Sequence, residues 1–369
     1  MTSSLQRLTL YVGGFMGPFG TVVILPMFPE LRDHFGVSSA TMAWAFTVYL
    51  IPFAALLLVS GTLGERWGRR RTVRATYVVY AVASLACAFA PNLAVFLGAR
   101  VLQGIANAFI TPLLIAGLAE IVPQERFGRV VGIYSSFQAL GGGLGPIVGG
   151  LAADTDWRFA FIGTAAIALA LSTSPPVGEP RPAASAPPIK PLLTMRMTLL
   201  GVAFLAAATG PVGISVLVGV TARDVLGLSG TSAGVLLFAG AMTALVLGPV
   251  WGRLVDGLGL KTSALIASTA VTVLAGSMAF AGGPWMLGAL WALASGFVGF
   301  TVVVFQALGA TIVPDNRGGA LSYLLGWRFL GHGVGPIIFL AILEQTVTGA
   351  FLGAAALGLI TIAVFATQG

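Results

Sequence analysis

Long apolar runs alternate with short polar breaks along the whole chain. Charged residues and Pro/Gly breaks divide the sequence into twelve such runs, six on each side of a proline-rich stretch. Lipid offers no partners for backbone N–H and C=O groups, and a helix needs about 20 apolar residues to cross it, so these runs predict transmembrane helices. The runs cover residues 8–29, 40–64, 72–90, 93–120, 128–152, 158–174, 197–222, 231–252, 262–281, 285–312, 318–343 and 348–367.

The proline-rich stretch divides the chain into two halves. Residues 174–190 read SPPVGEPRPAASAPPIK, in which the prolines prevent a helix and the small residues offer no core. We therefore predict an all-α membrane protein of about twelve helices. Its parts are an N-terminal six-helix bundle (1–174), a cytoplasmic linker (175–196) and a C-terminal six-helix bundle (197–369).

The composition excludes a soluble fold and gives no support to an enzyme. Hydrophobic residues make up 57% of the chain and charged residues only 8%, against roughly a quarter in soluble domains. The single cysteine, Cys87, excludes a disulfide within the chain and a cysteine metal cluster. The two histidines, His34 and His332, are far apart, and no nucleophile or phosphate-loop motif occurs. We expect no metal and no cofactor.

Basic residues gather on one side of the predicted membrane. Fourteen of them lie at the N-terminus or in the loops that follow even-numbered runs: Arg7, Arg66, Arg69, Arg70, Arg71, Arg74, Arg126, Arg129, Arg181, Lys190, Arg196, Arg253, Lys261 and Arg317. The opposite loops hold only Arg32, Arg158 and Arg223. Cytoplasmic loops are enriched in Lys and Arg, so both termini and the linker are expected in the cytoplasm.

The two halves repeat each other. Residues 61–70, GTLGERWGRR, correspond to 252–261, GRLVDGLGLK, a shift of 191 residues. Residues 123–128, PQERFG, correspond to 314–319, PDNRGG, at the same shift. Gly141, Gly145 and Pro146 recur 190 residues later as Gly331, Gly335 and Pro336. Such a parallel repeat is typical of transporters whose two halves rock about a site at the membrane midplane.

The loop at residues 61–70 resembles the signature of the major facilitator superfamily, Gly-x-x-x-Asp-Arg-x-Gly-Arg-Arg, with Glu65 in place of the aspartate. Residues 100–104, RVLQG, are similar to the Arg-x-x-Gln-Gly motif of its drug/proton antiporters. Residues 141–150, GGGLGPIVGG, resemble the Gly-x-x-x-Gly-Pro-x-x-Gly-Gly signature associated with exporters. The resemblance covers almost the whole chain and implies multidrug efflux.

The resemblance also implies a switch at the loop after the second run. Glu65 and Arg69 are expected to pair, with Glu120 as a third member, in one state of the gate and to separate in the other. The predicted gating residues are Gly61, Glu65, Arg66, Gly68, Arg69, Arg70 and Glu120, with Asp256 and Lys261 in the second copy. The alternative is that the loop arginines only fix its topology.

Small residues in the fifth run predict a close helix contact. Gly141, Gly145 and Gly149 recur every four residues and line one helix face without side chains, and Gly150 adjoins them. Pro146 removes a backbone hydrogen bond and favours a bend there.

Two arginines inside predicted runs suggest a pathway. An arginine within a span costs several kcal/mol unless it is paired, snorkels or faces a watery cavity. The candidates for a substrate or proton pathway are Arg100, Gln103, Asn107, Tyr134, Gln138, Gln306, Arg328 and His332. Other readings stay open: Arg100 can snorkel, His332 can be neutral and bonded to backbone, and the amides and Tyr134 can bond neighbouring helices.

The distribution of acids bears on the substrate. Exporters of cationic drugs in this superfamily usually resemble one another in an acid within the first span, where residues 19–21 here read FGT. No Asp or Glu falls at the centre of any run, so neutral or anionic lipophilic substrates suit Arg100 and Arg328 better. His332 is the natural proton carrier. Glu30 or Glu120, if burial raised its pKa, would be the next.

The sequence thus favours a proton-coupled exporter of small lipophilic or drug-like molecules that works by alternating access. The alternative with the same fold is a proton symporter that takes up a small organic anion. The expected partners are substrate, protons and the lipid of a bacterial inner membrane, and no nucleic acid. No extramembrane domain offers a docking surface, so a monomer is expected.

Overall fold

The structure, a computed structural model, describes residues 3–122, 124–176, 190–313 and 317–367, which are almost wholly helical. Most of the predicted linker lies outside these ranges, as do Pro123 and Pro314 of the sequence repeat. The first half contains α1 (Ser3–Val22), η1 (Leu25–Met27), α2 (Phe28–Phe35), α3 (Ser39–Met42), α4 (Trp44–Arg66), α5 (Arg69–Ala88), α6 (Leu93–Ile121), α7 (Gln124–Ala153) and α8 (Arg158–Ser172).

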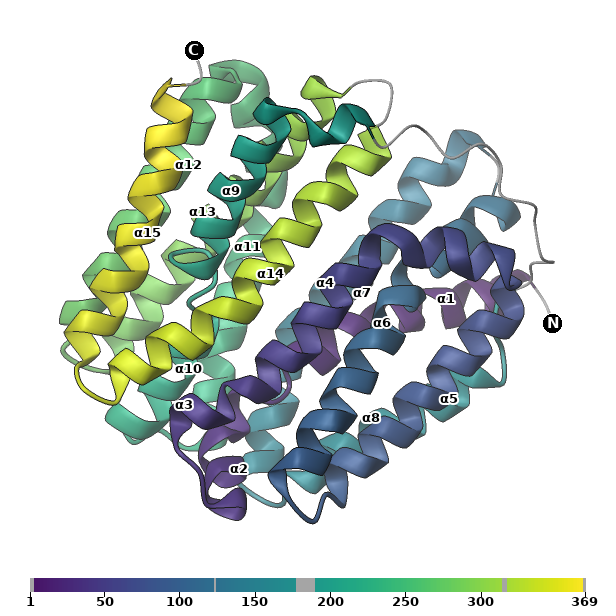
Figure 1. The fold of residues 1–369 in the computed structure, drawn as a ribbon, viewed down its shortest axis with the longest axis horizontal. Coiled ribbons are helices and arrows are strands. Elements are labelled where there is room, and N and C mark those ends of the chain that lie inside the picture. Colours follow the sequence, from purple (N-terminus) through teal and green to yellow (C-terminus); the bar gives the residue numbers. More distant parts are fainter. Residues whose placement is uncertain (1–2, 123, 177–189, 314–316, 368–369) are drawn as a thin grey trace.

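The second half repeats this order. It contains η2 (Lys190–Leu193), α9 (Met195–Thr209), α10 (Ser215–Val220), η3 (Thr221–Val225), α11 (Gly230–Leu258), α12 (Leu260–Ser277), η4 (Met278–Phe280), α13 (Pro284–Ile312), α14 (Arg317–Leu343) and α15 (Val347–Thr367). Figure 1 shows the two halves side by side, with α4 and α14 along their boundary.

The helices reproduce the predicted runs. Eight described segments are long and apolar enough to cross a membrane on length and composition alone. The other four runs correspond to α5, α7, α8 and α9. Of these, α5 begins with three consecutive arginines, and α9 is short because α10 and η3 complete its run. The predicted class, a helical membrane protein with two related six-helix bundles, is confirmed.

The halves pack alike and meet symmetrically. In the first, α1 packs on α7, α4 and α5 pack on α6, and α5 packs on α8; in the second, α9 packs on α14, α11 and α12 pack on α13, and α12 packs on α15. The boundary is formed mainly by α4 against α14 and by α7 against α11. These two contacts exchange under the rotation that relates the halves.

The first run is broken near its end and the seventh near its middle. The chain leaves α1 at Val22 and passes through η1 before α2, and it leaves α9 at Thr209 and starts α10 at Ser215. Pro26 and Pro211 lie in the two breaks. Proline has no backbone N–H, so it cannot donate the hydrogen bond that would continue a helix. An apolar run does not reveal such a break, so both were expected as single helices.

The broken segments end alike. Gly36 and Gly227 both have φ of 65°, a left-handed conformation that favours glycine. The Ser38 and Ser229 side chains then each accept a hydrogen bond from the backbone N–H three residues on, which caps the helix that follows. These positions are again 191 residues apart, so the repeat extends into the loops.

Glycines bring the α7 backbone against α1. A Cβ built at Gly141 would overlap the Phe15 carbonyl oxygen, and one at Gly149 would overlap the Val23 carbonyl oxygen. At Gly145 a Cβ would lie 2.7 Å from Val22. The spacing of these glycines therefore corresponds to the close contact it predicts.

Two further residues of this motif face the other half. A Cβ at Gly150 would overlap the carbonyl of Gly230 in α11, and the Pro146 carbonyl lies against Gly234 of the same helix. In the second half, Gly331 and Gly335 of α14 lie against α9 in the same manner as the α7 glycines lie against α1.

Replacing Gly149 by alanine is expected to lower the free energy of unfolding by about 2 kcal/mol, because the new methyl group overlaps the backbone of Val23, just beyond α1, which cannot move aside. Thermal unfolding of the purified protein in detergent measures the effect. Gly132→Ala is the matched control, since it lies on the same helix and its Cβ would meet nothing within 4 Å. Equal unfolding temperatures for the two variants would contradict the close contact.

Candidate functional site

Ion pairs join the two halves at one end of the molecule, which we call the α2 end. The Arg32 guanidinium donates to the Asp224 carboxylate at 2.7 Å and to the Ser39 hydroxyl at 3.0 Å. Arg223 pairs with Glu30 in the opposite sense. Each pair therefore connects α2 of the first half with η3 of the second.

The reciprocal pairing follows from the repeat. Arg32-Asp33 and Arg223-Asp224 stand 191 residues apart, and each arginine takes an acid from the other half. From sequence, both arginines were only exceptions to the charge bias, and Glu30 was only an alternative proton carrier. The recurring Arg-Asp dipeptide was the signal that could have revealed this cluster.

Two further acids complete the connection at the α2 end. Asp154, just beyond α7, accepts hydrogen bonds from the backbone N–H groups of Gly230 at 2.6 Å and Thr231 at 2.7 Å, and so caps α11. Burial acts to raise the pKa of Asp154, but the hydrogen bonds from Thr231 and Gly230 outweigh it and hold this pKa below its usual value. Glu344 accepts from the Ala40 N–H at 3.0 Å.

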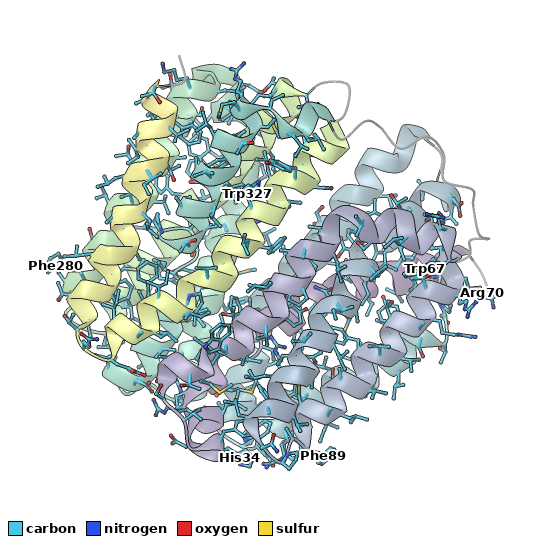
Figure 2. All side chains as sticks on the ribbon, viewed as in Figure 1. His34, Trp67, Arg70, Phe89, Phe280 and Trp327 are labelled. Carbon is cyan, nitrogen blue, oxygen red and sulfur yellow. The ribbon has the colours of Figure 1, made fainter. Side chains whose placement is uncertain are left out.

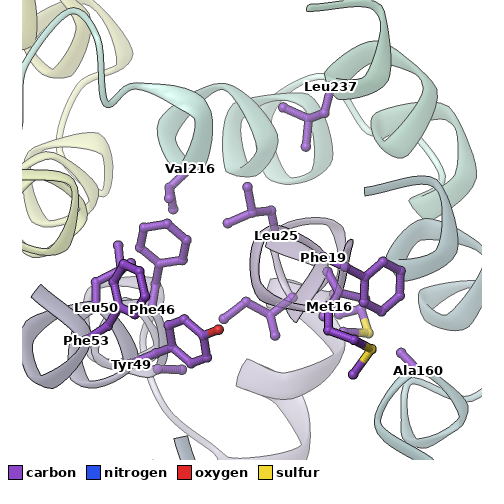
Figure 3. Packing of buried hydrophobic residues seen from close by; sticks show 14 of the residues in the cluster. Met16, Phe19, Leu25, Phe46, Tyr49, Leu50, Phe53, Ala160, Val216 and Leu237 are labelled. Carbon is purple, nitrogen blue, oxygen red and sulfur yellow. The ribbon is translucent and has the colours of Figure 1, made fainter. Parts of the chain in front are cut away.

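Apolar side chains of η1, α4 and α10 pack together where the two halves meet. Leu25 of η1, Phe46 of α4 and Val216 of α10 are almost fully buried and come from both halves. Figure 3 shows their side chains directed toward one another. The α2 end is therefore held by buried apolar contacts between the halves as well as by ion pairs.

Arg69 forms a second charged cluster at the opposite end, which we call the α5 end. Its guanidinium donates to Glu65 and to Glu120, both at 2.6 Å, and only 1% of Arg69 is exposed. These are the ion pairs implied by the motif, and they tie α4, α5 and α6 within the first half. That the cluster breaks in another state stays a prediction.

The other predicted gating residues of the first half surround this cluster. A Cβ at Gly61 would lie 3.3 Å from Pro112 of α6, and Gly68 has φ of 90°, which favours glycine. Arg66 and Arg70 are exposed. Their gating role also stays a prediction.

The second copy of the motif does not form such a cluster. Asp256 and Lys261 are exposed, and neither makes an ion pair with another residue that the structure describes. The shift of 191 residues places Leu260 where Arg69 stands in the first copy. The second half therefore lacks the bridging guanidinium, and a gating role for Asp256 and Lys261 stays a prediction.

Arg100 lies inside the first half and not between the halves. It is fully buried and donates to the carbonyls of Ala45 and Gly20, each at 3.0 Å, and to the Gln103 side chain at 2.8 Å. The guanidinium also lies over the Tyr49 ring, 4.3 Å from its centroid. Arg100 thus joins α1, α4 and α6 and does not snorkel, so the pathway role predicted for Arg100 and Gln103 stays untested.

Asn107 and Tyr134 are also enclosed in the first half. Both are buried against α1, where a Cβ at Gly17 would lie 2.5 Å from the Asn107 side chain and one at Gly14 would lie 2.6 Å from the Tyr134 ring. Both side chains are therefore packed on α1 within the first half. Their pathway role stays a prediction as well.

Sequence reasoning missed two tyrosines on the same helix face. Tyr77 and Tyr80 of α5 are buried with their hydroxyls directed at Gly13 and Gly20 of α1. The closely spaced glycines of α1 were the available signal, because each glycine leaves room for one large polar side chain from a neighbouring helix.

Arg328 and His332 occupy a different place, on α14. Arg328 Nε lies 3.3 Å from His332 Nε2, and the guanidinium carbon lies 5.5 Å from the centroid of the Phe329 ring. Phe329 in turn meets Phe53 of α4 edge to face, with ring centroids 4.8 Å apart. The two basic groups therefore stand beside an aromatic contact that crosses the boundary between the halves.

The helical period shows which way these two groups point. Gly326 and Gly333 of α14 face α4, whereas Gly331 and Gly335 face α9. At 100° per residue, Arg328 falls about 20° from Gly335, at the edge of the side that faces α9. His332 lies about 40° farther round the helix, and a Cβ built at Gly213, between α9 and α10, would lie 3.4 Å from its Nδ1. In the part of the chain that the structure describes, no carboxylate lies within ion-pair distance of Arg328.

The two remaining candidates lie on α7 and α13. Gln138 and Gln306 are half-buried, and the structure records no side-chain hydrogen bond for either among its described residues. Their role in a pathway stays a prediction.

An apolar pocket of about 290 Å³ opens between the halves on the other side of α14. Its lining comes from α4 and α14 alone, and the only polar groups on these side chains are the tyrosine hydroxyl and the indole N–H. The lining residues are Ile51, Ala54, Ala55, Tyr323, Gly326, Trp327 and Leu330.

A family model described as Major Facilitator Superfamily matches residues 10–222 and, a second time, residues 199–367. The chain belongs to this superfamily. The first matched region runs from the first bundle into the start of the second, and the second region covers the second bundle.

Among curated relatives, this transporter resembles proteins of Mycobacterium tuberculosis. It is 34% identical to a multidrug resistance protein B homolog over 157 residues, which are 41% of this chain and 28% of that protein. It is 32% identical to the drug efflux pump JefA over 162 residues, which are 42% of this chain and 32% of the pump. The matched part thus spans about a third of these relatives.

Solved structures share the fold of this transporter at low identity. A variant of the nucleoside transporter NupG superposes with a TM-score of 0.83 at 12% identity, covering 99% of this chain and all of that one. A D-xylose–proton symporter gives 0.74 at 17% identity, with 98% and 95% covered. A bacterial homolog of the human lysosomal transporter Spinster, in an inward-facing and occupied conformation, gives 0.74 at 18% identity, with 98% and 94% covered.

Replacing Asp224 by asparagine is expected to loosen the α2 end, because Arg32 loses its partner in the other half. A Val216→Cys reporter should then react with a water-soluble maleimide about fivefold faster, since a partly exposed ion pair contributes about 1 kcal/mol. The native Cys87 is fully buried and does not compete for the reagent.

Asp33→Asn is the matched control for this experiment. Asp33 is exposed and pairs with Arg32 within α2, so its loss leaves the connection between the halves intact. Equal labelling rates in the Asp224 and Asp33 variants would show that the cross-half pair does not hold this end closed.

Proposed function

We propose that this transporter is a proton-coupled exporter of small lipophilic or drug-like molecules with an anionic or strongly hydrogen-bond-accepting group, and that it works by alternating access. The observation that carries the proposal is the Arg328–His332 pair, a partly buried cation without a described acidic partner at the boundary between the halves. A guanidinium withdrawn from bulk water without an anion is costly, so a substrate that supplies one is favoured.

The surroundings of Arg328 define the rest of the substrate. Phe53 and Phe329 offer aromatic faces beside it. The pocket between α4 and α14, on the other side of α14, offers a second apolar surface between the halves. No acid falls at the centre of any sequence run to attract a cation. A flat or aliphatic molecule with a carboxylate, sulfonyl or phenolate group matches this combination.

The closed α2 end supports alternating access. With the termini and the α5 end in the cytoplasm, as the charge bias favours, the ion pairs and the apolar contacts between the halves separate the substrate region from the exterior. This is the state in which an exporter receives its cargo. Opening requires the loss of a few partly exposed ion pairs, which contribute about 1 kcal/mol each. Substrate binding or a proton gradient is able to supply this free energy.

His332 is the residue that we propose to couple transport to protons. Its imidazole touches Arg328, so protonation places a second positive charge beside the substrate group and changes the affinity for an anion. The names of the drug efflux pump and the multidrug resistance protein among the relatives support export.

The runner-up is uptake of a small organic anion with protons. A D-xylose–proton symporter shares the fold, and the same basic pair would serve a symporter. Uptake into right-side-out and inverted vesicles under an imposed pH gradient separates the two directions. In either case we propose that the protein acts as a monomer in the bacterial inner membrane.

Replacing Arg328 by glutamine is expected to lower transport of a lipophilic carboxylate dye at least tenfold, because a hydrogen bond to a charged group contributes about 1.5–3 kcal/mol. Transport of a matched quaternary ammonium dye should not fall. Proteoliposomes loaded with each dye under a pH gradient give both rates.

Arg328→Lys and Arg253→Gln complete the set. The lysine keeps the charge and should retain part of the carboxylate transport, whereas Arg253 is exposed at the far end of α11 and should be neutral. Equal loss for both dyes in Arg328→Gln would show that the residue does not recognise an anion.

A further inference from the structure

A groove of about 390 Å³ lies between α5 and α6, outside the boundary between the halves. Its floor and walls include Trp67, Arg71, Ala75, Val79, Ile105 and Phe109. Of these residues, only Arg71 carries a charge. The groove is therefore apolar along most of its length and basic at one place.

The groove faces the bilayer. α5 packs on α6 and α8 of its own half, and the outer side of the helix exposes apolar residues, including 41% of Val79. Such a face is covered by lipid in a membrane-spanning bundle. The occupant of the groove is therefore a component of the surrounding leaflet and not the transported substrate.

The basic end of the groove coincides with the α5 end. Arg71 lines it, and Arg70 and Arg74 are its exposed neighbours in the first turns of α5. The charge of Arg69 is already matched by Glu65 and Glu120. Figure 2 shows Arg70 and Trp67 close together at the margin of the first half.

The chemistry of the groove changes along its length as that of a membrane leaflet does, from a polar interface to hydrocarbon. From Arg71 to Val79 the helix advances by about 12 Å, and the lining changes from a guanidinium to aliphatic side chains over that length. Trp67 stands at the basic end and stacks on Phe109 with ring centroids 5.8 Å apart. Tryptophan favours this interfacial level, where one edge is wet and the other apolar.

We propose that this groove binds an anionic phospholipid, with the phosphate on Arg71 and one acyl chain between α5 and α6. Charge complementarity selects an anionic headgroup over a zwitterionic one, and the apolar lining holds the chain. Free phosphate lacks the chain and is not expected to occupy the site. The proposal does not depend on which substrate the transporter carries.

Quenching of tryptophan fluorescence tests the site. The intact protein is reconstituted in phosphatidylcholine nanodiscs, and brominated phosphatidylglycerol is titrated in, with brominated phosphatidylcholine as the reference. Trp67 lines the groove, so the anionic brominated lipid should quench more strongly at equal mole fraction. Trp67→Phe, which keeps a ring against Phe109, should abolish this excess.

Arg71→Gln is the deciding variant. It should weaken the preference for the anionic lipid about fivefold, since one basic residue near anionic lipid contributes about 1 kcal/mol. Arg253→Gln, which removes an exposed arginine from the end of α11, should leave the preference unchanged.

Three results would overturn the proposal. They are equal quenching by both lipids, an unaltered preference in Arg71→Gln, and displacement of the brominated lipid by inorganic phosphate alone. Circular dichroism and gel filtration of each variant verify that a lost signal does not come from misfolding.

Discussion

The two ion pairs between α2 and η3 are the interaction on which the state of this transporter depends. Arg32 reaches Asp224 and Arg223 reaches Glu30, so each half contributes one cation and one anion to the other. Pairs of this kind at a membrane edge are individually weak, and their sum is small enough to be reversed. The buried apolar contacts of Leu25, Phe46 and Val216 add to this weak connection between the halves.

The first half is held together by contacts within itself, so it is expected to move as one rigid body when the ion pairs break. α1 packs against the glycines of α7, and the glycines of α1 itself lie against Tyr77, Tyr80, Tyr134 and Asn107. Arg100 adds hydrogen bonds from α6 to two neighbouring helices in a region without water, where each bond is strong. Because these contacts stay within one half, motion is directed to the boundary along α4–α14 and α7–α11.

Much of the fold was predictable because lipid imposes simple rules. Run length gave the helices, and the shift of 191 residues related the halves. The resemblance to the family motif implied the ion pairs of Arg69 with Glu65 and Glu120, and the structure contains both. The breaks after Val22 and Thr209 were not predictable from hydrophobicity, since an apolar run continues through them.

The candidate site was harder to predict for a geometric reason. A polar residue within a span is expected to face protein, but its own sequence does not say whether it faces its bundle or the other half. Arg100 and Arg328 therefore gave the same prediction from sequence, although Arg100 is enclosed in one bundle and Arg328 lies at the boundary. Likewise, Arg32 and Arg223 find partners 192 and 193 residues away, which only the arrangement of the halves discloses.

Spin-label distances at both ends of the molecule test the rocking of the halves most directly. One labelled pair, His34→Cys with Gln345→Cys, spans the α2 end, and another, Thr62→Cys with Gly257→Cys, spans the α5 end; all four positions are exposed. In liposomes, adding Asp224→Asn should lengthen the distances across the α2 end and shorten those across the α5 end. A change at one end alone, or in the same direction at both, would contradict two rigid halves that turn about a shared boundary.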